Sequence, residues 1–322
     1  MIEVRNLTKR YGQHTAVDDI SFSIDSGEIV GFLGPNGAGK TTTMNIMTGF
    51  IAATVGDVKI NGIDILAEPS KAKANIGYLP DTPPVYGDMR VLEYLNFVAD
   101  IKGLRKRRDK NKKEMIQDVL EKVRIQDMSK RLVKNLSRGY RQRVGLAQAM
   151  LGDPKVIIMD EPTIGLDPQQ IIEMRDVVKN LGQKHTVILS SHIMQEVSAV
   201  CDRMLIINRG KIVAEGTPHD LSRGLQKGAG GVQVRIKGEK DRILTALKEC
   251  PTITEVESEP GKEPDTIDLT LGGGKDVDIR ETVFRACAKS DLPILLMKST
   301  ELTLEEIFLS LTGRGVLDDN DI

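Results

Sequence analysis

Short apolar runs alternate with longer amphipathic stretches through the middle of the chain. Three runs, at residues 156–159, 186–189 and 204–207, consist of Val, Ile, Leu and Met with a single Thr. Residues 169–181 and 193–200 separate these runs and carry apolar positions at helical spacing. Strands that alternate with helices in this way predict a parallel sheet with helices on both of its faces.

Other patterns surround this predicted sheet. Residues 2–7 and 16–24 alternate as half-buried strands do, and residues 57–62 form a short strand pattern closed by Asn-Gly. We expect these three segments to form an antiparallel sheet. Residues 76–79 predict one more strand, which prolines end, and a helical pattern fills most of residues 82–152. The predicted fold class is therefore α/β, with an antiparallel part, a parallel core and a helical part.

The pattern changes after Gly228-Ala229-Gly230-Gly231, whose composition predicts a linker. We therefore expect two domains, at 1–228 and 229–322. The pattern of the second domain predicts the order strand, helix, strand, strand, helix, strand, which is typical of a ferredoxin-like α+β unit. A last helix is expected at 304–311. The predicted elements are, in chain order, residues 232–236, 241–249, 254–257, 266–271, 277–290 and 294–297.

Composition narrows the class of protein. The chain has 322 residues, of which 40% are hydrophobic and 28% charged, and a net charge of −1. That length suits two domains, and the charge balance argues against nucleic acid as the main partner. Its Cys201, Cys250 and Cys287 are far apart and odd in number, which predicts reduced thiols in the cytosol rather than disulfides or a metal site. With no signal peptide and no apolar run near the roughly 20 residues of a membrane helix, we expect the chain neither to be exported nor to span a membrane.

A basic run occupies residues 102–113, with eight Lys or Arg against one Asp. A nucleic-acid-binding arm is one interpretation. A solvated helix face is favoured, because the run lacks interleaved aromatic residues and lies inside the predicted helical part. Contact with anionic lipid headgroups is a further alternative.

One loop between a predicted strand and a predicted helix carries a phosphate-binding pattern. The apolar run 29–33 precedes it, and residues 42–47 follow without a helix breaker. Its glycines let successive N–H groups point at phosphate oxygens, and the helix start adds partial positive charge. We expect Lys40 to reach the β- and γ-phosphates and the Thr41 hydroxyl to bind Mg²⁺, whereas a Gly-rich turn without a ligand is the alternative. The expected nucleotide-binding residues of this loop are Gly34, Asn36, Gly37, Ala38, Gly39, Lys40, Thr41 and Thr42.

Acidic residues and a histidine follow two other predicted strands. Asp160 and Glu161 close the run 156–159, and ligands of open α/β sheets bind at the carboxyl ends of strands. Buried acids are costly unless they are paired or bound to metal, so we expect Asp160 to hold Mg²⁺ and Glu161 to orient or deprotonate an attacking water. His192 ends the next strand and is expected to donate a hydrogen bond to the γ-phosphate, with a structural histidine as the alternative. Glu161, His192 and Lys40 are the expected catalytic residues.

These motifs, in this order, resemble those of the ATPase subunit of ATP-binding cassette (ABC) transporters, over residues 1 to about 225. The segment Leu136-Ser137-Arg138-Gly139-Tyr140 resembles the family signature Leu-Ser-Gly-Gly-Gln. Arg138 replaces the first glycine of that signature and Tyr140 replaces its glutamine. Ser137 and Gly139 match the two positions that the family uses, in trans, against the γ-phosphate of ATP held by a second subunit.

The resemblance implies further roles by position. Tyr11 matches the aromatic residue that stacks on adenine, although by residue type alone a core tyrosine is the alternative. Asp167 matches the loop that couples the two subunits. Asp81 stands where the family usually has a glutamine that contacts Mg²⁺ and relays to the membrane subunit; aspartate can also ligate Mg²⁺ but is shorter and charged.

The resemblance also implies partners and location. It predicts a head-to-tail homodimer that binds ATP and Mg²⁺ between its two copies. It also predicts a membrane permease on a separate chain that docks around residues 82–100. The protein would then lie at the cytoplasmic face of the membrane. The C-terminal unit, with residues 304–308, resembles the accessory domain of many bacterial ABC-2 type exporter ATPases. Asp81, the altered signature and residues 162–167 together are similar to a subgroup associated with gliding motility, which is not evidence of gliding.

Three other functions stay open at this stage. A soluble ABC ATPase acting on ribosomes or nucleic acid usually has two cassettes, whereas this chain has one phosphate loop. A DNA-repair ATPase of the same superfamily needs a long heptad coiled coil, which the sequence lacks. A catalytically weak regulatory or scaffolding module is the third alternative, because Asp81 and Arg138 depart from the family pattern; an ATPase assay discriminates it.

Overall fold

The computed structural model describes residues 1–104, 106–107, 110–224, 231–248, 250–273, 278–299 and 308. Its described residues form two compact units, one ending at Pro218 and one beginning at His219. Helix α8 (Pro218–Gly224) lies at this division. Most of the linker expected at 228–231 lies outside the described residues, so the domain boundary at residue 228 stays a prediction.

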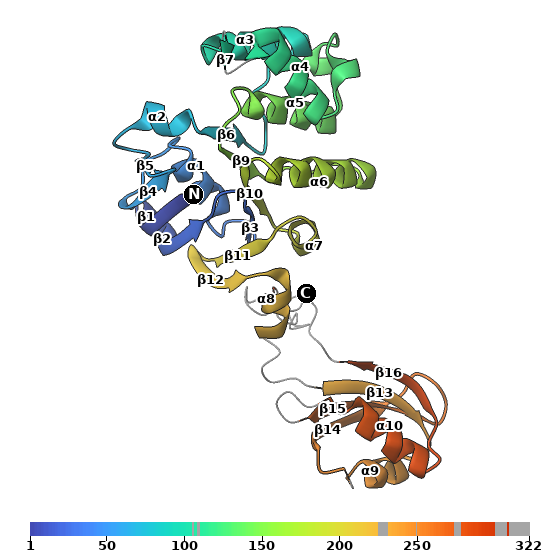
Figure 1. The fold of residues 1–322 in the computed structure, drawn as a ribbon. Helices are drawn as coiled ribbons and strands as arrows, with labels where there is room; N and C mark the ends of the chain where they lie inside the picture. Colours follow the sequence, from blue (N-terminus) through green and yellow to red (C-terminus); the bar gives the residue numbers. More distant parts are fainter. Residues whose placement is uncertain are drawn as a thin grey trace. The chain divides into compact units, whose positions relative to one another are not determined.

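A six-stranded sheet forms the centre of the first unit, in the order β12-β11-β3-β10-β9-β6 (Figure 1). Neighbouring strands run parallel except for β12, which runs antiparallel to β11. Every residue of β3, β9 and β10 is buried, as the continuous apolar runs predict for strands covered on both faces. Its strands are β3 (Ile29–Leu33), β6 (Ile76–Leu79), β9 (Val156–Asp160), β10 (Thr186–Ser191), β11 (Arg203–Asn208) and β12 (Lys211–Gly216).

Helices connect these strands and cover the sheet. Helix α1 (Lys40–Met47) follows β3, α6 (Pro168–Gly182) lies between β9 and β10, and α7 (Met194–Ser198) between β10 and β11. A close approach fixes α7: a Cβ added at Gly31 of β3 would lie 2.0 Å from Val197 Cγ1. The predicted parallel α/β core is confirmed.

An antiparallel sheet packs beside this core, in the order β2-β1-β4-β5. One buried apolar cluster joins its inner face to α1 and to one face of the central sheet. Phe22 and Phe32 meet in this cluster, with ring centroids 5.7 Å apart. The strands are β1 (Ile2–Tyr11), β2 (His14–Ile24), β4 (Val55–Ile60) and β5 (Ile63–Asp64), and the short helix α2 (Pro69–Lys73) follows them.

Three helices group together beyond β6 (Figure 1), as the helical pattern predicts. They are α3 (Val91–Ile101), α4 (Lys112–Lys122) and α5 (Arg138–Met150), with 3₁₀ turns at Gln126–Met128 and Val133–Asn135. Side chains cap two of these helices: Asn111 Oδ1 accepts from Glu114 N–H, and Ser137 Oγ from Tyr140 N–H. Among the helices that the structure describes, none combines the length and the apolar character of a membrane span.

Among the described residues of the basic run, only Lys112 and Lys113 lie in a helix, so the prediction of a helix face was wrong for most of the described part. Strand β7 (Lys106–Arg107) pairs antiparallel with β8 (Lys110–Asn111) in the described part of the run. Helix α3 ends before it, where Gly103 takes a φ of 66°, and Asn111 starts α4 as its N-cap. Between these two helix boundaries, the paired strands β7 and β8 take the place of the expected helix.

In the described part of residues 231–299, the second unit is a four-stranded antiparallel sheet with the helices α9 and α10 (Figure 1). The strand order β14-β15-β13-β16 and the chain order βαββαβ confirm the ferredoxin-like prediction. Its buried residues form one apolar cluster between sheet and helices. The helix expected at 304–311 lies outside the described residues except for Phe308. The elements are β13 (Gly231–Lys237), α9 (Lys240–Lys248), β14 (Ile253–Pro260), β15 (Thr266–Gly273), α10 (Arg280–Lys289) and β16 (Ile294–Ser299).

Candidate functional site

The carboxyl ends of four neighbouring strands bring the predicted site residues to one edge of the central sheet. Register places Ser190 of β10 beside both Asp160 of β9 and Phe32 of β3, and Leu79 of β6 beside Met159. The loops that follow these strands carry the phosphate-binding pattern, Glu161, His192 and Asp81. Parallel pairing therefore gathers residues that are far apart in the sequence, at the edge where open α/β sheets bind ligands.

Two glycines of the phosphate loop occupy positions that a side chain would not fit. A Cβ added at Gly34 would lie 2.3 Å from Ile207 O, and one at Gly39 would lie 2.5 Å from Ala16 O. Gly39 also has a φ of 109° and directly precedes α1. The chain thus curls tightly into a helix start, as the phosphate-binding pattern requires.

Lys40 is held inside this curl. Its side chain is 6% exposed, and Nζ donates to Gly34 O at 2.7 Å and to Pro35 O at 3.2 Å. The same Nζ lies 3.3 Å from Glu161 Oε1. The buried Lys40 ammonium therefore connects the loop after β3 with Glu161, the residue after β9. Its partners are all oxygen atoms, and phosphate oxygens can accept hydrogen bonds from it in the same way.

The Glu161 carboxylate lies between the Lys40 ammonium and the His192 imidazole. Its second carboxylate oxygen, Oε2, lies 2.9 Å from His192 Nδ1. Glu161 has a φ of 48°, in the left-handed region that a non-glycine residue rarely adopts. Such a backbone persists only where neighbouring contacts impose it, and it is common at functional sites. Here the Glu161 N–H donates to Ser190 Oγ at 3.0 Å.

Ser190 links both acidic residues and was not predicted as a site residue. It is fully buried, and its hydroxyl donates to Asp160 Oδ1 at 2.5 Å while accepting from the Glu161 N–H. Asp160 is 1% exposed. Burial, followed by the charges of Asp160 and Asp81, raises the pKa of Tyr78. The sequence signal for Ser190 is a hydroxyl that ends an apolar strand next to the strand with the acids.

A cavity of about 510 Å³ opens beside the loop. Tyr11 lies on its wall and is 50% exposed, so the alternative of a core tyrosine is wrong; the Lys9 ammonium lies 5.1 Å from its ring centroid. His14, Ala16 and Ile164 also line the cavity and were not predicted. Of the predicted nucleotide and magnesium residues, the lining includes Tyr11, Asn36, Gly37, Gly39, Lys40, Thr41, Thr42, Asp81 and Glu161, but not Gly34, Ala38, Asp160 or His192.

The residues predicted to act in trans, Ser137 and Gly139, and the predicted coupling residue Asp167 do not line this cavity in their own subunit. Gly139 and Asp167 line a separate hollow of about 190 Å³. Ser137 is the N-cap of α5, and Asp167 is the N-cap of α6, where its Oδ1 accepts from Gln170 N–H at 2.9 Å. The geometry of one subunit thus leaves Ser137 and Gly139 without a role toward its own phosphate loop.

The oxygen donors near the loop fit Mg²⁺. Thr41 lies in the cavity wall, and the Asp160 carboxylate, 1% exposed, accepts from the Ser190 hydroxyl through Oδ1. Asp81 Oδ1 is buried and has no hydrogen-bond partner among the described residues. Hydroxyl and carboxylate oxygens are the ligands that Mg²⁺ prefers. Thr41, Asp81 and Asp160 are therefore the residues that would hold the ion.

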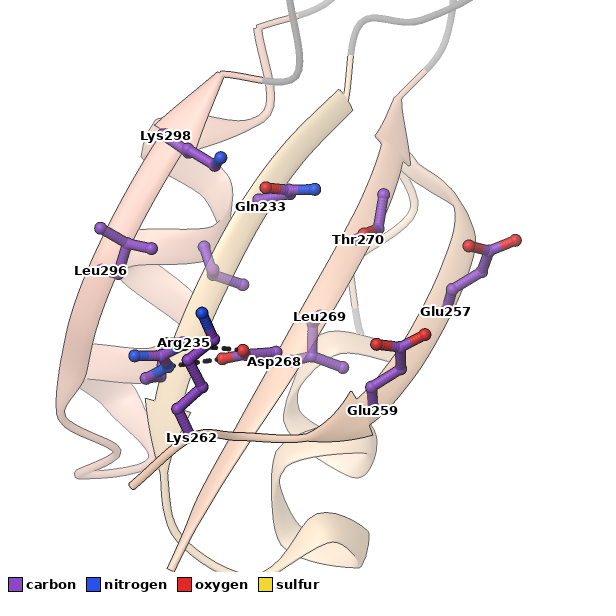
Figure 2. A pocket seen from close by; sticks show the side chains of 11 residues that line it. Gln233, Arg235, Glu257, Glu259, Lys262, Asp268, Leu269, Thr270, Leu296 and Lys298 are labelled. Carbon is purple, nitrogen blue, oxygen red and sulfur yellow. Dashed lines mark hydrogen bonds and ion pairs between the residues drawn. The ribbon is translucent and has the colours of Figure 1, made fainter. Parts of the chain in front are cut away.

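A further hollow, of about 320 Å³, lies on the face of the second unit's sheet opposite its helices (Figure 2). At its centre Arg235 of β13 donates to Asp268 of β15, with Nε–Oδ1 and Nη2–Oδ2 distances of 2.6 and 2.8 Å. Glu263 lies 3.2 Å from the same guanidinium. These central charges satisfy one another, so we give the pair a structural role in joining β13 to β15.

Comparison with known proteins identifies the family. A family model described as ABC transporter matches residues 17–164. The linearmycin resistance ATP-binding protein LnrL of Bacillus subtilis is 32% identical over 322 residues, which cover 99% of this chain and 100% of that protein. The chain belongs to the family of ABC transporter ATP-binding proteins. This ABC ATPase therefore binds ATP with Mg²⁺ and hydrolyses ATP to ADP and phosphate, as the sequence motifs predicted.

Two more relatives support the same assignment. The Nod factor export ATP-binding protein I of Ralstonia nicotianae is 31% identical to this ABC ATPase over 330 residues, which cover 99% of this chain and 95% of that protein. A solved ATP-binding subunit of an ABC transporter has a TM-score of 0.62 and 29% identity, over 70% of this chain and 93% of that one. The structural likeness confirms the predicted fold of the first unit.

Proposed function

We propose that this ABC ATPase drives an exporter, with Glu161 as the general base of hydrolysis. The supporting observation is the position of its carboxylate, 3.3 Å from Lys40 Nζ and 2.9 Å from His192 Nδ1, on the wall of the cavity beside the phosphate loop. A carboxylate held there can accept the proton of a water that attacks the γ-phosphorus. The bond to the leaving ADP oxygen then breaks, which yields phosphate.

The other residues of the loop hold the substrate. The N–H groups from Gly37 to Thr42 and the Lys40 ammonium would bind the phosphate oxygens, and Tyr11 would stack on the base. Thr41, Asp81 and Asp160 would hold Mg²⁺, which neutralises charge on the phosphates when it is bound. His192 would orient Glu161 and donate to the γ-phosphate.

The complete site would need a second copy of the chain. Ser137 and Gly139 lie at the start of α5 and outside the cavity of their own subunit, so they are available to a partner's nucleotide. A helix start offers N–H groups and partial positive charge to an anion. Loss of the γ-phosphate would remove the anion that both copies share, and the copies would then separate.

A permease on a separate chain would form the transport pathway. We propose residues 82–100 as the docking surface, because aromatic side chains gather there in solvent: Tyr86 is 54% and Phe97 37% exposed, with ring centroids 5.6 Å apart. Exposed apolar patches of this kind mark interaction surfaces. The protein would then lie at the inner face of the membrane. Export is favoured by the relatives named for linearmycin resistance and Nod factor export.

The Glu161→Gln variant tests the base assignment. We expect ATP still to bind, turnover to fall by about 10²–10⁴-fold, and an ATP-dependent dimer to accumulate on gel filtration. Glu121→Gln, which alters an exposed carboxylate on α4 outside the cavity, serves as the control and should keep turnover. Normal turnover of Glu161→Gln would reject Glu161 as the base, and a variant that stays monomeric with ATP would reject the shared-nucleotide dimer.

A further inference from the structure

Two of the residues that depart from the family pattern, Asp81 and Arg138, form an ion pair. Asp81 replaces the usual glutamine, Arg138 replaces a signature glycine, and Arg138 Nη2 lies 3.5 Å from Asp81 Oδ1. That oxygen is buried and has no hydrogen-bond partner among the described residues, so the guanidinium is its charge partner. Asp81 also lines the nucleotide cavity. The negative charge of Asp81, which the usual glutamine lacks, is therefore paired with the positive charge of Arg138, which the usual glycine lacks.

A second residue of helix α5 contacts Asp81. Gln142 lies one turn after Arg138, on the same face of α5, and its Nε2 donates to the Asp81 carbonyl oxygen at 2.8 Å. Further along this face, a Cβ added at Gly145 would lie 2.6 Å from Pro83 Cβ. The signature helix thus holds the side chain and the backbone of Asp81 and packs closely on the loop that carries it.

The loop after β9 confines the Arg138 guanidinium from another side. A Cβ added at Gly165 would lie 2.6 Å from Arg138 Nη1. Gly165 has a φ of 69°, so glycine suits this position for its backbone as well as for the space that Arg138 occupies. Arg138 therefore lies between the Asp81 loop and the loop that leads to Asp167.

We propose that Arg138 is a positioning residue for the nucleotide site of its own subunit. It neutralises the Asp81 carboxylate and holds it in place, so that an acid can stand beside a triphosphate where the family uses a neutral glutamine. The proposal rests on ATP binding in this cavity but not on the dimer or on export. Asp81 would hold Mg²⁺ with its second oxygen, Oδ2, and without Arg138 the charge that Mg²⁺ leaves on this carboxylate would repel the phosphates. Salt would screen that repulsion because both side chains are about half exposed, at 48% and 49%.

The test is a double-mutant cycle with Arg138→Gly, Asp81→Gln and the double variant, which restores the family residues at both positions. Arg124→Gly is the matched control: Arg124 pairs with Asp176 at 3.6 Å, both about half exposed and both outside the cavity, and its φ of 57° suits glycine. The readouts are the equilibrium Kd for ATP with Mg²⁺, measured by calorimetry, and the separate kcat and KM of the ATPase.

We expect Arg138→Gly to raise Kd and KM by about fivefold at low salt, the upper range for a half-exposed pair. The increase should shrink at about 500 mM salt, and Arg138→Lys should restore part of the affinity. In the Asp81→Gln background the Arg138→Gly change should leave Kd unaltered. Equal effects in both backgrounds, or a loss of kcat without a change of Kd, would overturn the proposal. Absent ATPase activity in the native protein would instead contradict the proposed function, while Kd would still test the pair.

Discussion

The Nδ1 atom of His192 lies 2.9 Å from the Oε2 atom of Glu161. Glu161 follows β9 and His192 follows β10, so parallel pairing of two adjacent strands creates this contact. A single hydrogen bond to one carboxylate oxygen leaves the other, Oε1, directed to Lys40. The imidazole thereby fixes the orientation of the carboxylate that we propose as the base.

Replacing His192 should slow hydrolysis more than it weakens binding. Without the imidazole, Glu161 loses its orienting partner, and we expect His192→Ala to lower kcat by about 10²-fold with KM little changed. Steady-state ATPase kinetics measure both constants. His219→Ala is a control of the same residue type outside the cavity. Equal kcat values for native protein and His192→Ala would assign the histidine a structural role only.

The hydroxyl of Ser190 should contribute to stability as well as to the site. In Ser190→Ala, the buried Asp160 oxygen and the Glu161 N–H both lose a partner, which we expect to cost about 1–3 kcal/mol of unfolding free energy. Urea denaturation measures the change. Ser23→Ala, at an exposed position of β2, should change stability little. Indistinguishable midpoints for the two variants would mean that the Ser190 hydrogen bonds contribute nothing.

Removing the Lys40 ammonium should abolish tight nucleotide binding. The Lys40→Ala variant loses the buried cation of the phosphate loop, and we expect the Kd for ATP with Mg²⁺ to rise by about 10²-fold or more. Calorimetric titration with the nucleotide tests this. Lys211→Ala removes an exposed lysine, 66% accessible, and should bind ATP normally. An unchanged Kd for Lys40→Ala would contradict the phosphate-loop assignment.

Sequence patterns predicted the buried strands and the site loops, because burial and ligand chemistry restrict which residues can stand there. The fully buried strands β3, β9 and β10 consist mostly of apolar residues. The loops after β3 and β9 carry the phosphate-binding pattern and Glu161, which are specific to nucleotide sites. The hairpin β7–β8 was predicted as helix because a run of Lys and Arg has no periodicity, so only its glycine and asparagine boundaries could have shown it. Strand β12 was missed because its residues alternate between exposed and half-buried.

Contacts between distant segments could not be predicted from one sequence. Ser190 bonds the residues after β9 only because β9 and β10 are neighbours in register, which sequence order does not specify. The pairing of Asp81 with Arg138 joins a loop to a helix start 57 positions away in the printed sequence. Each residue was noted as a departure from the family pattern, and only the fold explains the two together.

Acid should destabilise the second unit through Asp268. The hydrogen bond from Arg235 lowers the pKa of Asp268 below its ordinary value of 3.8. The folded state therefore holds this proton less tightly than the unfolded state, so the pair stabilises fully above about pH 4 and loses its contribution as the pH falls through the lowered pKa. We expect Asp268→Asn to lower the stability of this unit at pH 7 and to flatten the decline of that stability as the pH falls below about 4.

Hydrogen exchange of the β13 and β15 amides in the full chain measures this local stability. Glu257→Gln is the matched control, because Glu257 lies on the same sheet face and lines the same hollow (Figure 2). It should keep the native pH profile, since no ion pair with Arg235 is lost. If Asp268→Asn followed the native profile over the whole acid range, the Arg235 contact would not be what stabilises this sheet, and the central pair of the hollow would be free to serve a ligand instead.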